Sequence, residues 1–211
     1  MQLDPTAFNA FLANMAQHAQ WRRSHACPCR NPRSGQADRA CAQCHGLGTW
    51  WEDAVDTSVA LSGQKVQQEW AKLGKWESGD QVVTLASDVP AYAMGLHDRL
   101  TMLDSTVPFS RVLRPGEPVR ERVASLDKAT WFTDGALFDV YPPPLVADDG
   151  TLEWPGQMPP DGAQIAISGR RHPEYFALQE FPQDRAHHGG RDLPRRVVLR
   201  AMDLFGRAAG G

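Results

Sequence analysis

Four cysteines are the residues of this sequence whose type and spacing most clearly indicate chemistry. They form two close pairs, C-P-C at 27–29 and C-A-Q-C at 41–44, and the other residues of the 211-residue chain include no cysteine. A tetrahedral zinc ion takes four thiolates at about 2.3 Å, and two short turns can supply them if the intervening loop folds back. Residues 30–40 provide such a loop. We therefore predict that one zinc ion is bound by Cys27, Cys29, Cys41 and Cys44.

The alternatives for these cysteines are two disulfides or four free thiols. Disulfides are disfavoured because residues 1–20 show neither the apolar nor the basic region of a secretory signal. Free thiols would have no reason to cluster. His25 and His45 flank the pairs, and either could replace a cysteine as a ligand. Since four thiolates close the coordination sphere, we expect the metal to hold the fold and to do no chemistry.

Composition places the chain among ordinary soluble proteins. Hydrophobic residues make up 42%, charged residues 22%, and the net charge is −3, with no apolar run long enough for a membrane span. The charge is uneven: residues 20–46 hold five arginines against Asp38, a local +4, which leaves −7 for the rest. A basic module of this kind could meet a phosphate backbone or an acidic protein face, or its charge could serve solubility alone.

The patterns along the chain predict a mainly β fold. Asp4-Pro5 starts an amphipathic helix that we expect to reach Trp21. Trp50 and Trp51 are expected to form a small core beside the metal. After residue 54 we expect no helix longer than a turn or two, and short strands broken by turn residues. The expected strands are 59–61, 65–73, 81–85, 99–103, 109–113, 119–126, 136–141, 163–169, 175–179 and 195–204.

These elements suggest three parts. Residues 1–22 form the N-terminal helix, residues 23–54 the four-cysteine zinc-binding module, and residues 55–211 a β-barrel-like body with extended loops or arms. The proline-rich segment 141–156 is one expected arm, and Asp148-Asp149-Gly150 within it is typical of a hairpin turn. The charged segment 181–191 is the other. His187 and His188 with Asp184 could form a second metal or acid–base site, but a contact with a partner fits this loop better.

Several motifs together resemble structural proteins of tailed bacteriophages. They are the N-terminal helix, the C-P-C…C-x-x-C-x-G-x-G module at 27–48 and G-D-x-V-x-T-L at 79–85. The fourth is the C-terminal segment 169–200, G-R-R-H-P-E-Y-F…D-R-A-H-H-G…L-P-R-R-V-V-L-R. The chain is similar in particular to components of the neck, the connector or stopper rings between portal and tail. The resemblance covers most of the chain. The metal module departs from the simplest stopper barrel. The resemblance therefore does not distinguish a stopper from an adaptor or another ring protein of the neck.

The resemblance implies a non-enzymatic virion protein. It would form a ring of six or twelve copies, contact the adjacent portal or adaptor and tail proteins, and face packaged DNA in the channel. It would be found in the virion, and in the host cytoplasm during assembly, with no membrane contact. An alternative is a zinc ribbon beside an OB-like barrel that binds nucleic acid, supported by the arginines of the module. A metalloenzyme with an open site at His45 lacks an identifiable general base.

Overall fold

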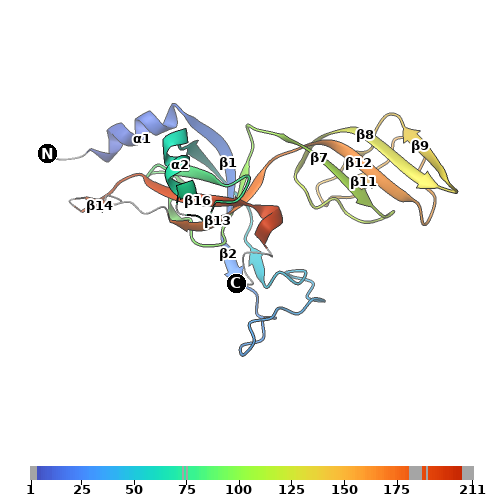
Figure 1. Ribbon diagram of the computed structural model, residues 1–211, viewed down its shortest axis with the longest axis horizontal. Helices are drawn as coiled ribbons and strands as arrows, with labels where there is room; N and C mark the ends of the chain where they lie inside the picture. The colour runs from blue at the N-terminus through green and yellow to red at the C-terminus, as the bar shows by residue number, and fades with distance from the viewer. Residues whose placement is uncertain (1–3, 73, 75, 181–186, 189, 206–211) are drawn as a thin grey trace. The chain divides into compact units, whose positions relative to one another are not determined.

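The computed structural model describes residues 4–72, 74, 76–180, 187–188 and 190–205. The fold is mainly β, as predicted, and Figure 1 shows the order of its elements. The helices are α1 (Pro5–Ala13), α2 (Gln64–Lys72) and the 3-10 turns η1 (Pro90–Ala93) and η2 (Met202–Leu204). The strands are β1 (Ala16–Arg22), β2 (Ser24–Ala26), β3 (Thr49–Trp51), β4 (Val55–Leu61), β5 (Gln81–Leu85), β6 (Arg99–Met102), β7 (Val107–Leu113), β8 (Val123–Thr133), β9 (Ala136–Val140), β10 (Leu145–Val146), β11 (Leu152–Glu153), β12 (Gln164–Arg171), β13 (Glu174–Glu180), β14 (His187–His188), β15 (Arg191–Asp192) and β16 (Arg195–Ala201).

The chain folds as two compact units, which corrects the expectation of a single body over residues 55–211. Unit 1 comprises residues 1–103 and 174–211, and unit 2 comprises residues 104–173. Unit 2 is thus inserted in the chain between β6 and β13, two strands that pair directly with each other. The sequence showed no composition shift at 104 or 173, so the boundary depends on long-range strand pairing.

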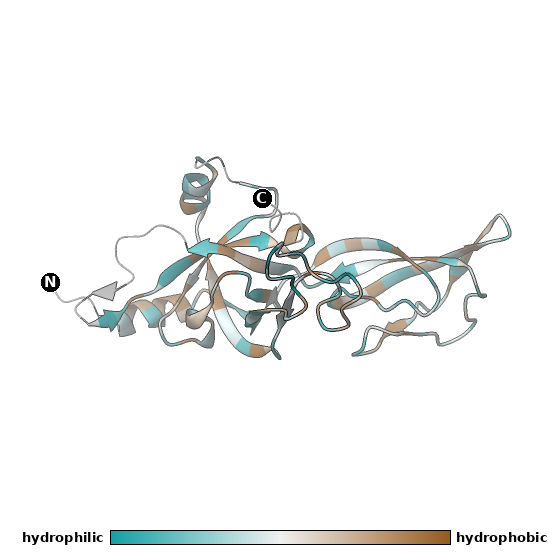
Figure 2. Ribbon diagram, turned by 90° about the horizontal axis from the view of Figure 1, so that it is seen from below, coloured by the Kyte–Doolittle hydropathy of each residue, from teal (hydrophilic) through white to brown (hydrophobic). Residues whose placement is uncertain are grey.

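Unit 1 is built around a closed barrel of six antiparallel strands in the order β1-β4-β5-β16-β13-β6. These strands carry many apolar residues (Figure 2), and because successive side chains of a strand point to opposite faces, each strand turns one set of them into the barrel. The interior holds Trp21, Val83, Leu85, Leu100 and Leu199, all buried. The predicted barrel is therefore confirmed.

The N-terminal helix is shorter than predicted. The Asp4 cap is present, with the Thr6 N–H donating to its carboxylate at 3.0 Å, but α1 ends at Ala13. The expected helix to Trp21 is wrong because β1 begins at Ala16 and pairs with β4 on one side and β6 on the other. Ala19 and Trp21 alternate along this strand and fill the barrel. The spacing of the apolar residues also fitted a helix, but the burial of Ala19 and Trp21 in the barrel favours the strand.

The expected strand at 65–73 is also wrong, as is the expectation of no helix longer than a turn or two after residue 54, since Gln64–Lys72 form the nine-residue helix α2. Val66 and Trp70 are four residues apart and so share one helix face. They pack against Val82 of β5 and Val198 of β16, a cross-strand pair whose side chains point out of the barrel. Trp70 is completely buried there. The helix thus covers apolar positions that a barrel strand would otherwise expose.

Unit 2 contains a four-stranded sheet in the order β7-β12-β8-β9. Its core includes Leu113, Trp131, Ile165 and Ile167, and β8 starts at Val123, later than the expected 119. The proline-rich segment is not a free arm: the β10–β11 hairpin and Trp154 pack against this core. Its turn at Asp148-Asp149-Gly150 is as predicted. The segment stays packed on unit 2 because its apolar residues cover the sheet.

Candidate metal centre

The four cysteines lie in a long loop that leaves and re-enters a short two-stranded sheet. Strands β2 and β3 pair from Ser24 opposite Trp51 to Ala26 opposite Thr49. Directly after β2, the N–H of Cys27 donates to the carbonyl of Gly48 at 2.9 Å and closes the base of the loop. This pairing places the first cysteine pair beside the second, although Cys27 and Cys41 are 14 positions apart in the chain.

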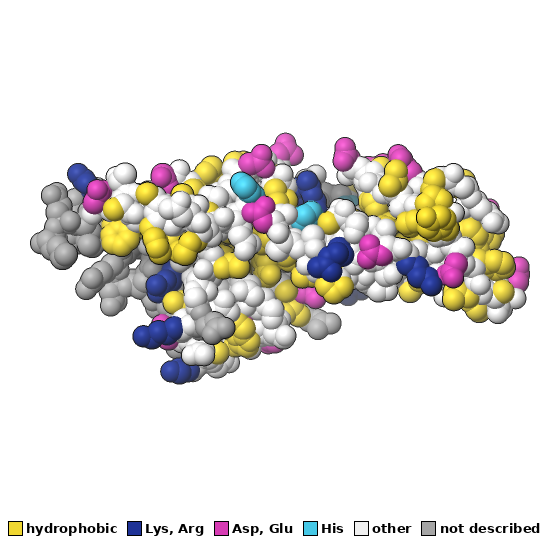
Figure 3. All heavy atoms as spheres, turned by 90° about the horizontal axis from the view of Figure 1, so that it is seen from above, with side chains coloured by type: hydrophobic (Ala, Val, Ile, Leu, Met, Phe, Trp, Pro, Cys, Tyr) yellow, Lys and Arg dark blue, Asp and Glu magenta, His cyan; other side chains and the backbone are white. Residues whose placement is uncertain are grey.

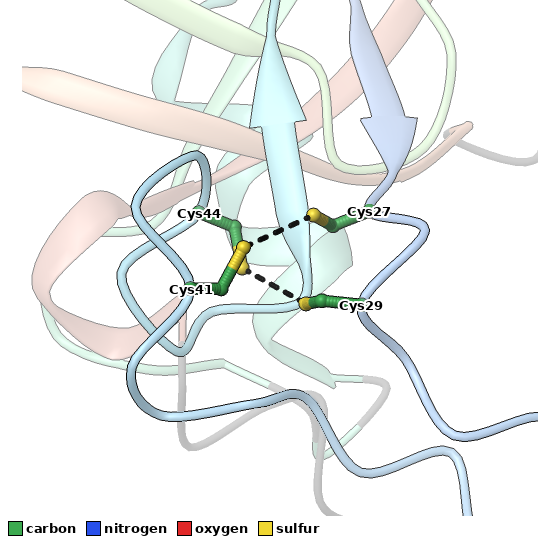
Figure 4. A group of neighbouring side chains, drawn as sticks. All are labelled: Cys27, Cys29, Cys41 and Cys44. Carbon is green, nitrogen blue, oxygen red and sulfur yellow. Dashed lines mark hydrogen bonds between the residues drawn. The ribbon is translucent and has the colours of Figure 1, made fainter.

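The four sulfurs point toward one another, as Figure 4 shows, and all lie within 4.8 Å of one another. The Sγ atoms of Cys27 and Cys41 are 3.8 Å apart, and those of Cys29 and Cys44 are 3.4 Å apart. All four cysteines are free thiols, at distances far above the roughly 2.05 Å of a disulfide. A tetrahedron with metal–sulfur bonds of about 2.3 Å has sulfur–sulfur edges of about 3.8 Å. The cluster therefore fits a four-coordinate metal ion.

The turn after the second pair directs backbone N–H groups at sulfur. The N–H of Gly48 donates to the Cys44 Sγ at 3.3 Å. This turn needs positive φ at His45 (49°), Gly46 (84°) and Gly48 (70°). At Gly48 an added Cβ would also lie 2.5 Å from the Arg30 Nε. Both the positive φ and the limited space therefore favour glycine at this position.

These surroundings give two of the thiols very different proton affinities. Desolvation by burial raises the pKa of Cys29 to about 12 in the metal-free protein. Desolvation acts on Cys44 too, but the N–H of Gly48, the Cys29 side chain and the N–H of Gly46 outweigh it and lower the pKa of Cys44 to about 7. Hydrogen bonds to a thiolate favour the charged form, which is the form that binds metal.

Neither flanking histidine belongs to the group of described residues that could hold the metal. His25 instead contacts Glu52, with Nε2 and Oε1 2.6 Å apart, and stacks on the Trp50 ring at 4.7 Å. His45 occupies the turn with positive φ. Trp51 has contacts outside the cysteine loop: its Nε1–H donates to the carbonyl of His97 at 2.9 Å and its ring meets Phe205 edge-on.

A buried carboxylate that the sequence reasoning missed connects the cysteine loop to the barrel. Asp98 is 2% exposed and accepts hydrogen bonds from the Trp21 Nε1–H at 2.9 Å, the Ser24 N–H at 2.7 Å and the Ser24 hydroxyl at 2.9 Å. The N–H of Gly95 is a further donor at 2.8 Å. The signal in the sequence was an acid directly before the expected strand at 99–103.

The other residues considered for chemistry do not come together in the same way. His187 and His188 pair with Arg191 and Asp192 as the short strands β14 and β15, while Asp184 lies outside the described residues. Asp149 caps its turn by accepting the Thr151 N–H at 2.8 Å, and this hydrogen bond lowers its pKa. Among the described residues, only the four cysteines form a group that could hold a metal ion.

No protein-family model matches this chain, and no curated protein matches it. The helices within the described ranges include none that is long and apolar enough to cross a membrane.

Proposed function

We propose that the cysteine centre binds Zn²⁺ as a structural ion, and that the chain is a structural subunit of a tailed-bacteriophage neck. In this role it forms a ring between portal and tail and takes part in head–tail joining, without enzymatic activity. The sequence motifs at 27–48, 79–85 and 169–200 support the neck assignment by resemblance. The observation that carries an assembly role is the surface of α1.

Helix α1 directs its apolar side chains outward. Phe8 and Phe11 of the helix are 45% and 61% exposed and Met15, just after it, is 51% exposed, whereas Asn9 is the buried residue of the helix. Unit 2 exposes further large apolar side chains, including Phe132 and Leu137 at 50% and 66%. Figure 3 shows hydrophobic side chains gathered on the surface of both units. Apolar surface at several places is typical of a protein that is covered in an assembly.

Zinc is the ion that best suits the centre. Four thiolates in a tetrahedral arrangement bind zinc or iron, and zinc in such a closed site supplies a cross-link without redox chemistry. The module has little apolar material of its own, since Trp51 contacts His97 and Phe205 instead. A metal cross-link is therefore what would hold residues 27–48 together.

Metal analysis tests the zinc assignment. The purified protein should contain about one zinc per chain, and Cys44→Ser should lose it. The same substitution should unfold residues 25–52 and leave most of the barrel folded, which near-ultraviolet circular dichroism and hydrogen exchange would separate. Ser34→Ala, an exposed change in the same loop, is the control. Stoichiometric iron, or disulfides between these cysteines, would contradict the assignment.

The neck assignment is tested on virions. Electron microscopy and mass spectrometry of the phage that encodes this chain should find it in a ring at the head–tail junction, in six or twelve copies. Deleting its gene should give filled heads and free tails that do not join. Normal virions lacking the protein would contradict the proposal.

The nucleic-acid alternative makes a different prediction for the purified protein. A DNA-binding monomer should show affinity that falls steeply with salt. A tetrathiolate zinc centre carries a net charge of −2, so the arginines of residues 20–46 also have a role in balancing the metal centre. That balance favours the assembly proposal over the alternative.

A further inference from the structure

Helix α1 is attached to the barrel by a polar residue. The Asn9 side-chain amide donates to the Ser87 hydroxyl at 3.0 Å, and its carbonyl oxygen accepts the Ser87 N–H at 3.1 Å. The two phenylalanines of α1, Phe8 and Phe11, stay exposed. This is the reverse of a surface helix that packs its apolar stripe on its own domain. The exposed stripe is therefore available for a contact outside unit 1.

The stripe forms one wall of an apolar groove within unit 1. Phe8, Phe11, Leu12 and Met15 face Leu61, Val66 and Leu193 across an open volume of about 580 Å³. Arg196 is the only charged residue among those that line the groove. Within the described part of the chain, its guanidinium has no hydrogen-bond or ion-pair partner. An occupant should thus offer apolar side chains beside one acid.

The β8–β9 hairpin of unit 2 offers this combination. Its two-residue turn, Asp134-Gly135, has φ values of 51° and 78°, the conformation of a tight type I′ hairpin. Phe132 and Leu137 lie directly opposite each other before and after the turn, so their side chains share one face. Both are exposed, and Asp134 is an exposed acid at the tip.

The hairpin also lies at the end of its sheet. Strand β9 is last in the order β7-β12-β8-β9, and no strand among the described residues pairs with its outer edge. An exposed edge strand with apolar side chains favours association unless another surface covers it. This hairpin is therefore the element of unit 2 best suited to insert into a groove.

We propose that the β8–β9 hairpin of one copy docks in the α1 groove of a second copy of this chain. Phe132 and Leu137 contact the apolar walls, and the Asp134 carboxylate pairs with Arg196. The contact joins two different surfaces, so it is heterologous and can repeat from copy to copy, as a ring requires. This inference rests on the proposed assembly role and names the surfaces that carry it.

Charge, apolar contact area and conformational entropy all favour the hairpin as the occupant of the groove. The acid at the tip of the hairpin, Asp134, matches the one base of the groove, which fixes orientation and excludes partners that carry a base there. A phenylalanine buries about 150–250 Å² of surface, so the Phe132–Leu137 pair gives a substantial apolar contact. A two-residue turn is already rigid, and docking it loses little conformational entropy.

Mixing two variants tests the docking. Phe11→Ser damages the groove and Phe132→Ser damages the hairpin, and both positions are exposed, so each variant should melt close to wild type. In sedimentation velocity the wild type should form assemblies that grow with concentration, and each variant alone should be monomeric. An equimolar mixture should give dimers and nothing larger, because only one intact groove and one intact hairpin can meet.

A mixture that stays monomeric overturns the proposal, as do variants that assemble like wild type. A wild type that remains monomeric up to about 1 mM also overturns it, since even a weak contact associates at that concentration.

A charge exchange tests the ion pair. Arg196→Asp and Asp134→Arg should each weaken association by at least about tenfold, and the two changes combined in one chain should restore it. Arg120→Asp, on an exposed loop, is the matched control and should leave association unchanged. Failure of the double variant to recover would contradict direct contact between these residues.

The outcome is separable from that of the neck assignment. If the protein occupies the neck but Phe132→Ser still enters the ring, only the docking is wrong. If the protein is missing from virions while the mixture experiment succeeds, only the neck assignment is wrong.

Discussion

At the scale of single residues, the environment of each sulfur determines how the centre takes up metal. Cys44 receives the Gly48 N–H and has its pKa lowered to about 7, while desolvation raises the pKa of Cys29 to about 12. Metal must displace a proton from Cys29 throughout the physiological range. It must displace one from Cys44 only below about pH 7. Cys44 is thus the thiolate that is ready for metal in the neutral, metal-free protein.

Metal affinity should therefore increase with pH, and more steeply below about pH 7 than above it. The sign follows from competition: Cys29 is already protonated at neutral pH, and as pH falls below about 7 Cys44 is protonated too, so one more proton must leave for each metal bound. Competition titrations with a zinc-binding dye at about pH 6 and about pH 8, with proton release measured beside them, check this. Affinity or proton release that does not change with pH would contradict the assignment of Cys44.

At the scale of elements, a buried carboxylate joins α2, β5 and β16. Asp80 is completely buried and receives the Arg200 Nε–H at 3.0 Å and the Nη2–H at 2.9 Å. The Trp70 Nε1–H and the Glu77 N–H donate to the same carboxylate, at 3.3 and 3.1 Å. The hydrogen bonds from Arg200 to Asp80 raise the pKa of Arg200 further. The ion pair holds the helix over the outer face of the barrel.

Asp80→Ala should destabilise unit 1 by about 3–5 kcal/mol, because it leaves a largely buried guanidinium without its carboxylate. Thermal and denaturant unfolding, followed by tryptophan fluorescence, measure the change. Asp53→Ala removes an exposed acid and should alter stability by less than about 0.5 kcal/mol. Equal stability of the two variants would show that the ion pair does not hold α2 in place.

At the scale of the whole molecule, unit 2 is an insertion between two strands that are already neighbours. Thr101 of β6 pairs with Glu174 of β13, and the Arg99 Nη2 lies 2.6 Å from the Glu174 Oε2. The barrel is closed by these and the other five strand pairs without any residue of 104–173. Each unit has its own apolar core.

Replacing residues 104–173 with a short Gly–Ser turn should therefore leave a folded barrel that still binds metal. Its unfolding free energy should change by less than about 1 kcal/mol, because β6 and β13 can be joined as an ordinary hairpin. The far-ultraviolet circular dichroism, melting temperature and zinc content of the shortened chain check this. An unfolded product would show that the barrel needs unit 2.

Much of the fold and of the candidate site follows from local sequence. The C-P-C and C-x-x-C pairs indicated the centre because thiolates cluster for few reasons other than metal. The strands at 81–85 and 195–201, the second expected to reach 204, were recognisable because short runs rich in β-branched residues between turn residues are typical of strands. The Asp148-Asp149-Gly150 turn and the Asp4 cap are local devices, and both occur where predicted.

Only the tertiary structure decided the rest. Residues 16–22 fit a helix by spacing but form β1, because two flanking strands pair with them and bury Trp21. Residues 64–72 form α2 because Trp70 covers Val82 and Val198, which are brought together from positions far apart in the chain. The inserted unit 2 and the contacts of Asp98 depend in the same way on partners at long range. Spacing within a segment records its own periodicity and contains no information on which distant surface will cover it.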